Sequence, residues 1–183
     1  MSARSGTAPS PRPATWLKAE RTWRDGDTVE IDMPAKLAVT VWPRTGSVTV
    51  DRGPLSYSVR IEEDWHRAGG TDTWPEWEVF PKSPWNYGLA IDRADPVASL
   101  EVKEKPVSTT QPWTLDAVPI EITAHARRIP NWRIEDNTVQ ALRQSPVRSD
   151  QPEETIRMVP LGCARLRMSC LPVIDNGPDA REW

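Results

Sequence analysis

The chain has 183 residues and a formal net charge of −3, with acidic and basic residues mixed along it. It lacks the basic stripe that neutralises phosphates and the run of about eighteen apolar residues that spans a bilayer, so we expect neither nucleic acid nor a membrane as a partner. Ten tryptophans and nineteen prolines occur in a composition that is only 38% hydrophobic. Proline interrupts helices and large aromatic side chains fill the space between sheets, which predicts an all-β fold of antiparallel β-sandwich units.

Both ends of the chain are expected to be loose. Residues 1–15 are polar and rich in proline, which is typical of disordered segments. They contain no apolar stretch of the kind found in a secretory signal, and this favours a cytoplasmic location. Residues 173–183 are also polar, and we expect them to form a loose tail.

The N-terminal part contains short alternating stretches separated by turn residues. Apolar and polar side chains alternate, as in half-buried strands, in residues 28–33, 37–41, 48–50 and 55–61. Asp25-Gly26 predicts a tight turn, whereas Gly53-Pro54 interrupts the alternation and predicts a bulge or a sheet edge. Four or five strands are few for a closed sandwich, so we interpret residues 16–64 as the later strands of an incomplete one.

Residues 65–79 differ from the strands on either side because they show no period of two. We predict a long loop that links two β units, anchored in part by its aromatic side chains. Three tryptophans in this segment, Trp65, Trp74 and Trp77, are candidate carbohydrate contacts. Exposed indole rings can stack on the apolar faces of sugars while nearby carboxylates bind hydroxyl groups. The alternative is that these rings pack over a sandwich or over another domain, and the acidic residues form a solvated face.

Residues 80–172 are expected to form a C-terminal β-sandwich. Strands are predicted at residues 89–91, 99–103, 118–126, 155–161 and 163–171. Ahead of the first of these strands, Trp85 and Tyr87 are two residues apart, so their rings lie on one face of an extended chain. Gly88 follows, where a side chain would block the close approach of another segment. We interpret Trp85 as an anchor of the core.

The two cysteines are predicted to be structural. On one straight strand Cys163 and Cys170 would be roughly 23 Å apart and on opposite faces, too far for a disulfide. The alternation places Cys170 inside and Cys163 outside. The two histidines, His66 and His125, stand in no recognisable arrangement with a cysteine, and the spacing of a zinc site is missing. We therefore expect no catalytic residue, no metal site and no cofactor.

Five stretches, taken together and in order, resemble one family. They are residues 23–31 (WRDGDTVEI), 51–57 (DRGPLSY), 83–89 (SPWNYGL), 128–132 (RIPNW) and 158–168 (MVPLGCARLRM). In this order they resemble the C-terminal part of the β-L-arabinofuranosidase-like glycoside hydrolases, glycoside hydrolase family 127 and its relatives. In that family an (α/α)6 toroid carries the catalytic groups, and β-sandwich domains follow it. The match covers residues 16–172 and contains none of the toroid.

The resemblance implies a non-catalytic β-sandwich region that braces a catalytic toroid and borders its substrate cleft. This chain alone is then expected to be inactive, and the absent toroid leaves two origins open, a fragment of a longer protein or a stand-alone β protein. The expected partner is a catalytic toroid of the same or an adjacent chain, with an arabinose-containing carbohydrate as a candidate ligand. The alternative function is a stand-alone carbohydrate-binding module that uses exposed tryptophans, and an intact small enzyme ranks last.

Overall fold

The computed structural model describes residue 16, residue 18 and residues 20–183, so the predicted disorder of residues 1–15 lies outside the described part. The chain divides into two compact units, Met1–Met33 and Pro34–Trp183. The all-β prediction is confirmed, since the paired strands are antiparallel and the only helical pieces in the described residues are two short 3₁₀ turns. These turns are η1 (Pro96–Ser99) and η2 (Leu161–Cys163).

In the first unit the predicted turn forms but the predicted strand does not. Gly26 has a φ of +83°, and the backbone N–H of Asp27 donates to the carbonyl of Arg24 at 3.1 Å. Residues 28–33 form no strand, although their side chains alternate in sequence, and their apolar members are exposed. The prediction of a strand here was wrong because alternating side chains allow a segment to join a sheet but are not sufficient for it to do so. A strand also needs a neighbour that bonds to its backbone.

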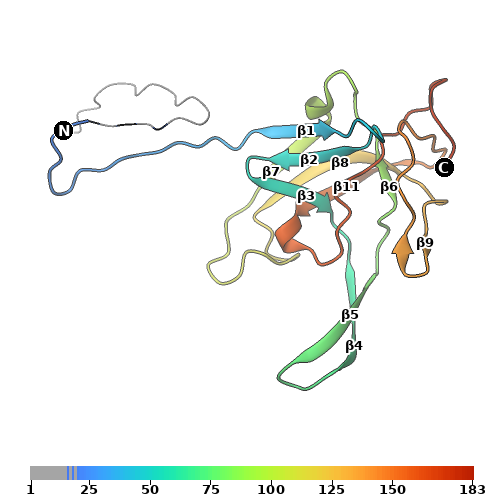
Figure 1. The fold of residues 1–183 in the computed structure, drawn as a ribbon, viewed down its shortest axis with the longest axis horizontal. Coiled ribbons are helices and arrows are strands. Elements are labelled where there is room, and N and C mark those ends of the chain that lie inside the picture. The colour runs from blue at the N-terminus through green and yellow to red at the C-terminus, as the bar shows by residue number, and fades with distance from the viewer. Residues whose placement is uncertain (1–15, 17, 19) are drawn as a thin grey trace. The chain divides into compact units, whose positions relative to one another are not determined.

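In the second unit, seven strands form one curled antiparallel sheet in the order β1-β2-β3-β11-β8-β6, with β7 beside β8 (Figure 1). Their bounds are β1 Leu37–Val41, β2 Val48–Arg52, β3 Leu55–Val59, β6 Tyr87–Leu89, β7 Leu100–Glu104, β8 Ile120–Arg128 and β11 Glu153–Pro160. Each corresponds to a predicted strand within about two residues, as expected where one face of a strand is buried and the other is solvated. A separate small hairpin consists of β9 (Ile134–Glu135) and β10 (Thr138–Val139).

Strands from the two halves of the sequence share this sheet. Val59 of β3 pairs with Met158 of β11, and Tyr57 pairs with Pro160. The structure therefore joins the predicted partial sandwich and the predicted C-terminal sandwich through one continuous ladder. Gly53, with a φ of +56°, closes a two-residue hairpin between β2 and β3 in place of the expected bulge.

The segment expected to be a linking loop is an antiparallel hairpin. Its strands are β4 (Glu63–Gly70) and β5 (Pro75–Pro81), with a register shift between Arg67 and Gly69. Figure 1 shows that the β4–β5 hairpin projects away from the seven-stranded sheet. The loop prediction failed because the hairpin has no buried face, and without one the sequence shows no alternation.

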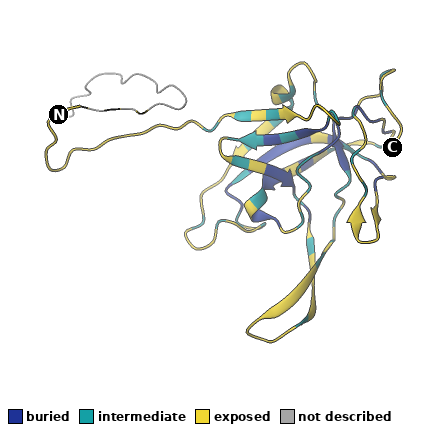
Figure 2. Ribbon diagram, in the orientation of Figure 1, coloured by how far each residue is buried: buried dark blue, intermediate teal, exposed yellow. Residues whose placement is uncertain are grey.

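The core includes side chains from five strands of the sheet and from the C-terminal segment, and Figure 2 shows that the buried residues concentrate in the sheet. Trp132 is its largest buried side chain, and its ring centroid lies 5.3 Å from that of Trp85 and 4.9 Å from that of Trp183. Trp85 is half-buried and packs against the core. The core is therefore anchored by Trp85 together with Trp132, which the sequence analysis did not single out. A Cβ on Gly88 would meet Ile174 Cδ1 at 2.5 Å, so the close approach predicted there is made by a side chain.

The C-terminal segment also departs from expectation. Residues 163–171 were predicted to be a strand, but the chain leaves β11 through η2 and continues in extended form. The N–H of Val48 donates to the carbonyl of Leu171, and the N–H of Leu89 donates to the carbonyl of Pro172, both at 2.8 Å. Val173 and Ile174 are buried and the ring of Trp183 packs on Trp132, so the tail predicted to be loose is held at both its ends. Backbone groups at the ends of β2 and β6 require partners, and this segment supplies them.

The exposure of the two cysteines is the reverse of the prediction. Cys163 is buried and Cys170 is half-buried, and both thiols are free. The prediction assumed one straight strand, whereas the 3₁₀ turn at Cys163 rotates the chain there. Arg165 and Arg167 are exposed.

Candidate functional site

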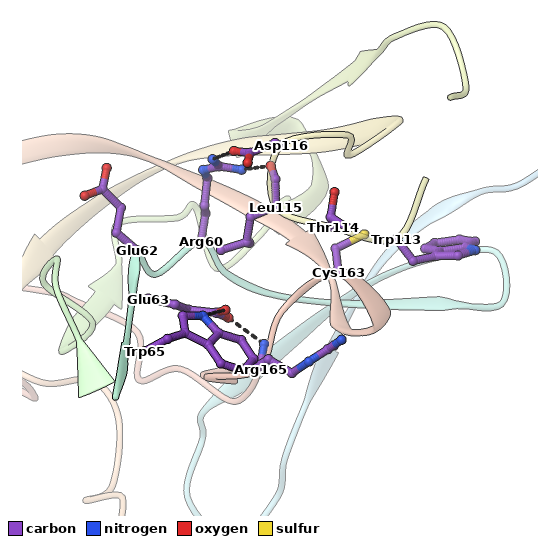
Figure 3. Close-up of a pocket in the computed structure, with 10 residues that line it drawn as sticks. All are labelled: Arg60, Glu62, Glu63, Trp65, Trp113, Thr114, Leu115, Asp116, Cys163 and Arg165. Carbon is purple, nitrogen blue, oxygen red and sulfur yellow. Dashed lines mark hydrogen bonds and ion pairs between the residues drawn. The ribbon is translucent and has the colours of Figure 1, made fainter. Parts of the chain in front are cut away.

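A cavity of about 410 Å³ opens where the base of the β4–β5 hairpin meets residues 113–116 and η2. Figure 3 labels its ten lining residues, and we call it the basal cavity. Its volume falls within the range of about 300–1,000 Å³ that is typical of small-molecule sites. Aromatic, acidic and basic side chains all contribute to its wall.

Glu63 ties the hairpin to the chain that follows η2. One carboxylate oxygen accepts the N–H of Arg165 at 2.6 Å and that of Leu166 at 3.4 Å. The other accepts the indole N–H of Trp65 at 3.2 Å. Because a carboxylate that accepts backbone N–H groups is held firmly, Glu63 fixes both the base of the hairpin and the ring of Trp65.

Arg60 holds the opposite wall of the cavity. Its backbone N–H donates to the carbonyl of Arg157 at 2.8 Å, which continues the pairing of β3 with β11. Its guanidinium donates to the carbonyl of Leu115 and lies 3.7 Å from the carboxylate of Asp116 (Figure 3). The loop of residues 113–116 is thus fastened to the sheet by one side chain.

Cys163 lies between these walls, and its environment is that of a structural thiol. It packs in a small second core with Val118, Val159 and Ala164, on the face of β11 opposite the main core. Burial raises the pKa of the Cys163 thiol, which disfavours the thiolate that a nucleophile needs. Neither histidine lines the cavity. The expectation that this chain has no catalytic residue remains a prediction.

The structure brings two of the three candidate carbohydrate contacts together. Trp65 and Trp77 lie on one face of the β4–β5 hairpin with their ring centroids 6.0 Å apart in an edge-to-face arrangement. They are 44% and 49% exposed, so both side chains are accessible to a ligand. Trp74 lies at the tip of the hairpin, 79% exposed, and does not line the cavity.

Sequence reasoning missed Arg60 and the loop of residues 113–116, none of which was considered as part of a site. No local pattern marks them, because their meeting depends on the pairing of β3 with β11 and on the return of the loop that precedes β8. An aromatic residue beside Pro112 was the single available signal.

The opposite face of the hairpin carries a second, fully solvated cluster. His66 Nε2 lies 2.9 Å from the carboxylate of Asp64, and its ring packs edge-to-face against Phe80 at 5.3 Å. The hydrogen bond from His66 lowers the pKa of Asp64. Across residue 16, residue 18 and residues 20–183, no set of three or more His, Cys, Asp or Glu side chains is arranged to hold a metal ion. In the same residues no helix has the length and apolar character needed to cross a membrane.

Comparisons of the chain with protein-family models, with curated proteins and with solved structures found no match.

Proposed function

We propose that this chain is a non-catalytic β region that docks onto a partner domain through the β4–β5 hairpin. The sequence resemblance supplies the identity of the partner, the (α/α)6 catalytic toroid of a β-L-arabinofuranosidase-like glycoside hydrolase. The role is to brace that toroid and to border its substrate cleft. The observation that carries the proposal is the exposed aromatic surface of a hairpin that pairs only with itself within residues 34–183.

The physical argument begins with the stability of such a hairpin. A two-stranded ribbon is marginally stable in water unless it packs on something else. The β4–β5 hairpin exposes Trp65 and Trp77 on one face, Phe80 on the other and Trp74 at its tip. Tryptophan is enriched among the residues that dominate binding energy at protein interfaces, and clustered exposed aromatic residues mark such surfaces. A hairpin of this composition fits an arm that is stabilised further by contact with a partner.

The base of the hairpin is fixed to the rest of the second unit. Glu63 holds it to the segment after η2, and the N–H of Lys82 donates to the carbonyl of Glu62 at 2.8 Å where the two strands leave the sheet. The ends of the arm are therefore fixed while its tip is free. An arm fixed at one end positions a docked domain relative to the sheet, as bracing requires.

The test mixes this chain with a catalytic toroid of the family that has been expressed without its own β domains. We expect a complex by light scattering after size exclusion. The double variant Trp77→Ala/Phe80→Ala should weaken it about tenfold or more, because two exposed aromatic anchors are removed. Trp42→Ala, which truncates an exposed tryptophan just after β1, is the matched control and should bind normally. If no complex forms with the unaltered chain, the proposal fails.

A second candidate is a stand-alone carbohydrate-binding module that uses Trp65, Trp74 and Trp77. The exposure of all three rings favours it. Retention of the chain on an arabinan column, with loss of retention in the triple Trp→Ala variant, would place this candidate ahead of docking. Loss of retention in Trp42→Ala as well would mean that the column binds the chain without a specific site.

A further inference from the structure

We propose that the basal cavity binds the end of a neutral oligosaccharide, with the first sugar inside the cavity and the next on the ring of Trp77. The inference deepens the carbohydrate-binding candidate, on which it rests for the role of Trp65. It differs in naming a defined pocket, in recruiting Arg60, Glu62 and Asp116, and in leaving Trp74 out.

The ring of Trp65 is already held in place for stacking. Its indole N–H donates to Glu63, which is itself fixed by two backbone N–H groups, and the ring packs edge-to-face with that of Trp77. A side chain held in this way loses little conformational freedom when a ligand binds, so little of the interaction energy is spent on ordering it. At 44% exposure the side chain is still accessible to a ligand. Figure 3 shows Trp65 beside Glu63 among the residues that line the cavity.

The polar groups of the wall match vicinal hydroxyls. The carboxylates of Glu62 and Asp116 are acceptors with two oxygens each, and the guanidinium of Arg60 is a planar donor with several N–H groups. Arg60 is fixed by Leu115, so it is preorganised. The side chain of Glu62 forms no hydrogen bond or ion pair with the described residues, which leaves both oxygens open to a ligand. Neighbouring hydroxyls of a sugar both donate and accept, and such a wall satisfies both requirements.

The charge of the cavity selects against anions. Its ionisable wall consists of the three carboxylates of Glu62, Glu63 and Asp116 and of the two guanidinium groups of Arg60 and Arg165, a balance of two positive and three negative charges. Glu63 and Arg60 are already engaged within the protein. Asp116 is paired with Arg60, so a phosphate or uronate would meet the open carboxylate of Glu62 in a wall whose net charge is −1, and like charges repel. A neutral polyol has no such penalty.

The hairpin extends the site beyond the cavity. In the register of the hairpin Trp65 is opposite Val79 and Trp77 is opposite Arg67, so the two indoles lie on neighbouring pairs of the same face. Their centroids are 6.0 Å apart, and a chain leaving the cavity over Trp65 therefore meets Trp77 next. Trp74, at the tip, is separate from this path. The structure accordingly assigns the ligand as an oligomer that enters by one end.

The experiment titrates the full chain, labelled with ¹⁵N, with xylotetraose, arabinotetraose and cellotetraose as neutral probes and with trigalacturonate as the anionic probe. The indole N–H signals of Trp65, Trp74 and Trp77 are assigned by single Trp→Phe variants. We expect at least one neutral probe to shift the Trp65 and Trp77 signals while the Trp74 signal stays in place. Trigalacturonate should bind at least about tenfold more weakly than that probe.

Two variants and one control complete the test. Trp65→Ala should weaken the neutral probe about tenfold or more, and Trp74→Ala should leave it unchanged. Glu62→Gln is at an exposed position whose side chain has no partner to lose, so the fold is preserved, and the variant should weaken binding about two- to tenfold. The proposal is overturned if no neutral probe moves the Trp65 signal, if trigalacturonate binds as tightly, or if Trp74→Ala costs as much as Trp65→Ala. Retention on arabinan without any shift of the Trp65 signal would reject the basal cavity and leave the broader carbohydrate-binding candidate standing.

Discussion

The seven-stranded sheet and the β4–β5 hairpin use the same kinds of residue for opposite purposes. In the sheet, Trp132 is 1% exposed and is packed between two other tryptophans. In the hairpin, Trp77 is 49% exposed and touches one neighbouring ring. Figure 2 shows the same division, with the buried residues in the sheet and the exposed ones along the hairpin. The difference lies in what surrounds each strand, since segments distant in sequence cover the sheet whereas the hairpin is closed by local pairing alone.

This comparison separates residues that stabilise the fold from residues that are free for a ligand. Burial in the sheet contributes to the free energy of unfolding, whereas an exposed ring contributes little until something covers it. The hairpin is thus the place where aromatic side chains are available for binding at small cost to stability. Four changes test this division, in order of expected effect.

The largest effect is expected from Trp132→Ala. Removing a fully buried indole leaves a cavity and typically costs about 3–5 kcal/mol, a large share of the stability of a domain. Denaturant unfolding should show this loss, or the variant should fail to express in soluble form. Trp77→Ala in the hairpin is the matched control and should change the free energy of unfolding by less than about 0.5 kcal/mol. Equal losses in the two variants would mean that the hairpin is part of the cooperative core.

Gly88→Ala should have the next largest effect, because Gly88 in β6 lies in close contact with the side chain of Ile174. The added Cβ would meet Ile174 Cδ1 at 2.5 Å and Ile129 Cδ1 at 3.2 Å. Overpacking of this kind costs about 1–3 kcal/mol, measurable as a lower denaturant midpoint. Gly162→Ala, whose Cβ would find Trp113 at an ordinary 3.6 Å, is the control and should be neutral. If Gly88→Ala leaves the denaturant midpoint unchanged, the segment that carries Ile174 can shift at little cost in stability.

A smaller effect is expected from Tyr87→Phe. The hydroxyl of Tyr87 donates to Glu154 at 2.9 Å. Burial, together with this hydrogen bond, raises the pKa of Tyr87 from 10.0 to about 12. As the pH rises above 10 the unfolded chain releases this proton first, while the native state keeps it up to about pH 12, so the free energy of unfolding falls across that window. Tyr87→Phe should unfold with a shallower fall over the same range. An unchanged slope would contradict the raised pKa of Tyr87.

The smallest effect on global stability is expected from Gly70→Ala at the turn of the hairpin. Gly70 has a φ of +75°, and an added Cβ would collide with the carbonyl of Trp74. The turn should open, and trypsin should cleave faster after Arg67. Because the hairpin contributes little to the core, the melting temperature should move by less than about 2 °C. A larger fall would show that the hairpin stabilises the sheet, and Gly177→Ala, a loop glycine in ordinary contact with Asp175, is the control.

The sequence by itself determined the strands that bury one face. Residues 37–41 and 118–126 alternate clearly and became β1 and β8, because a half-buried strand must place its apolar side chains on one side. The turn at Asp25-Gly26 was also predictable, since glycine adopts a positive φ at no steric cost. These features depend on a few neighbouring residues, so a linear reading captures them.

Tertiary structure decided the rest. Residues 28–33 alternate as well as β1 does but form no strand, because no backbone within residue 16, residue 18 and residues 20–183 pairs with them. The 3₁₀ turn at η2 reversed the exposure of the two cysteines, and the β4–β5 hairpin formed without any alternation because neither of its faces is buried. The basal cavity exists because β3 pairs with β11 and so brings Arg60 and Cys163 to the loop before β8. Contacts between segments so far apart in sequence depend on which backbone groups find partners in three dimensions, and no local pattern of side chains encodes that choice.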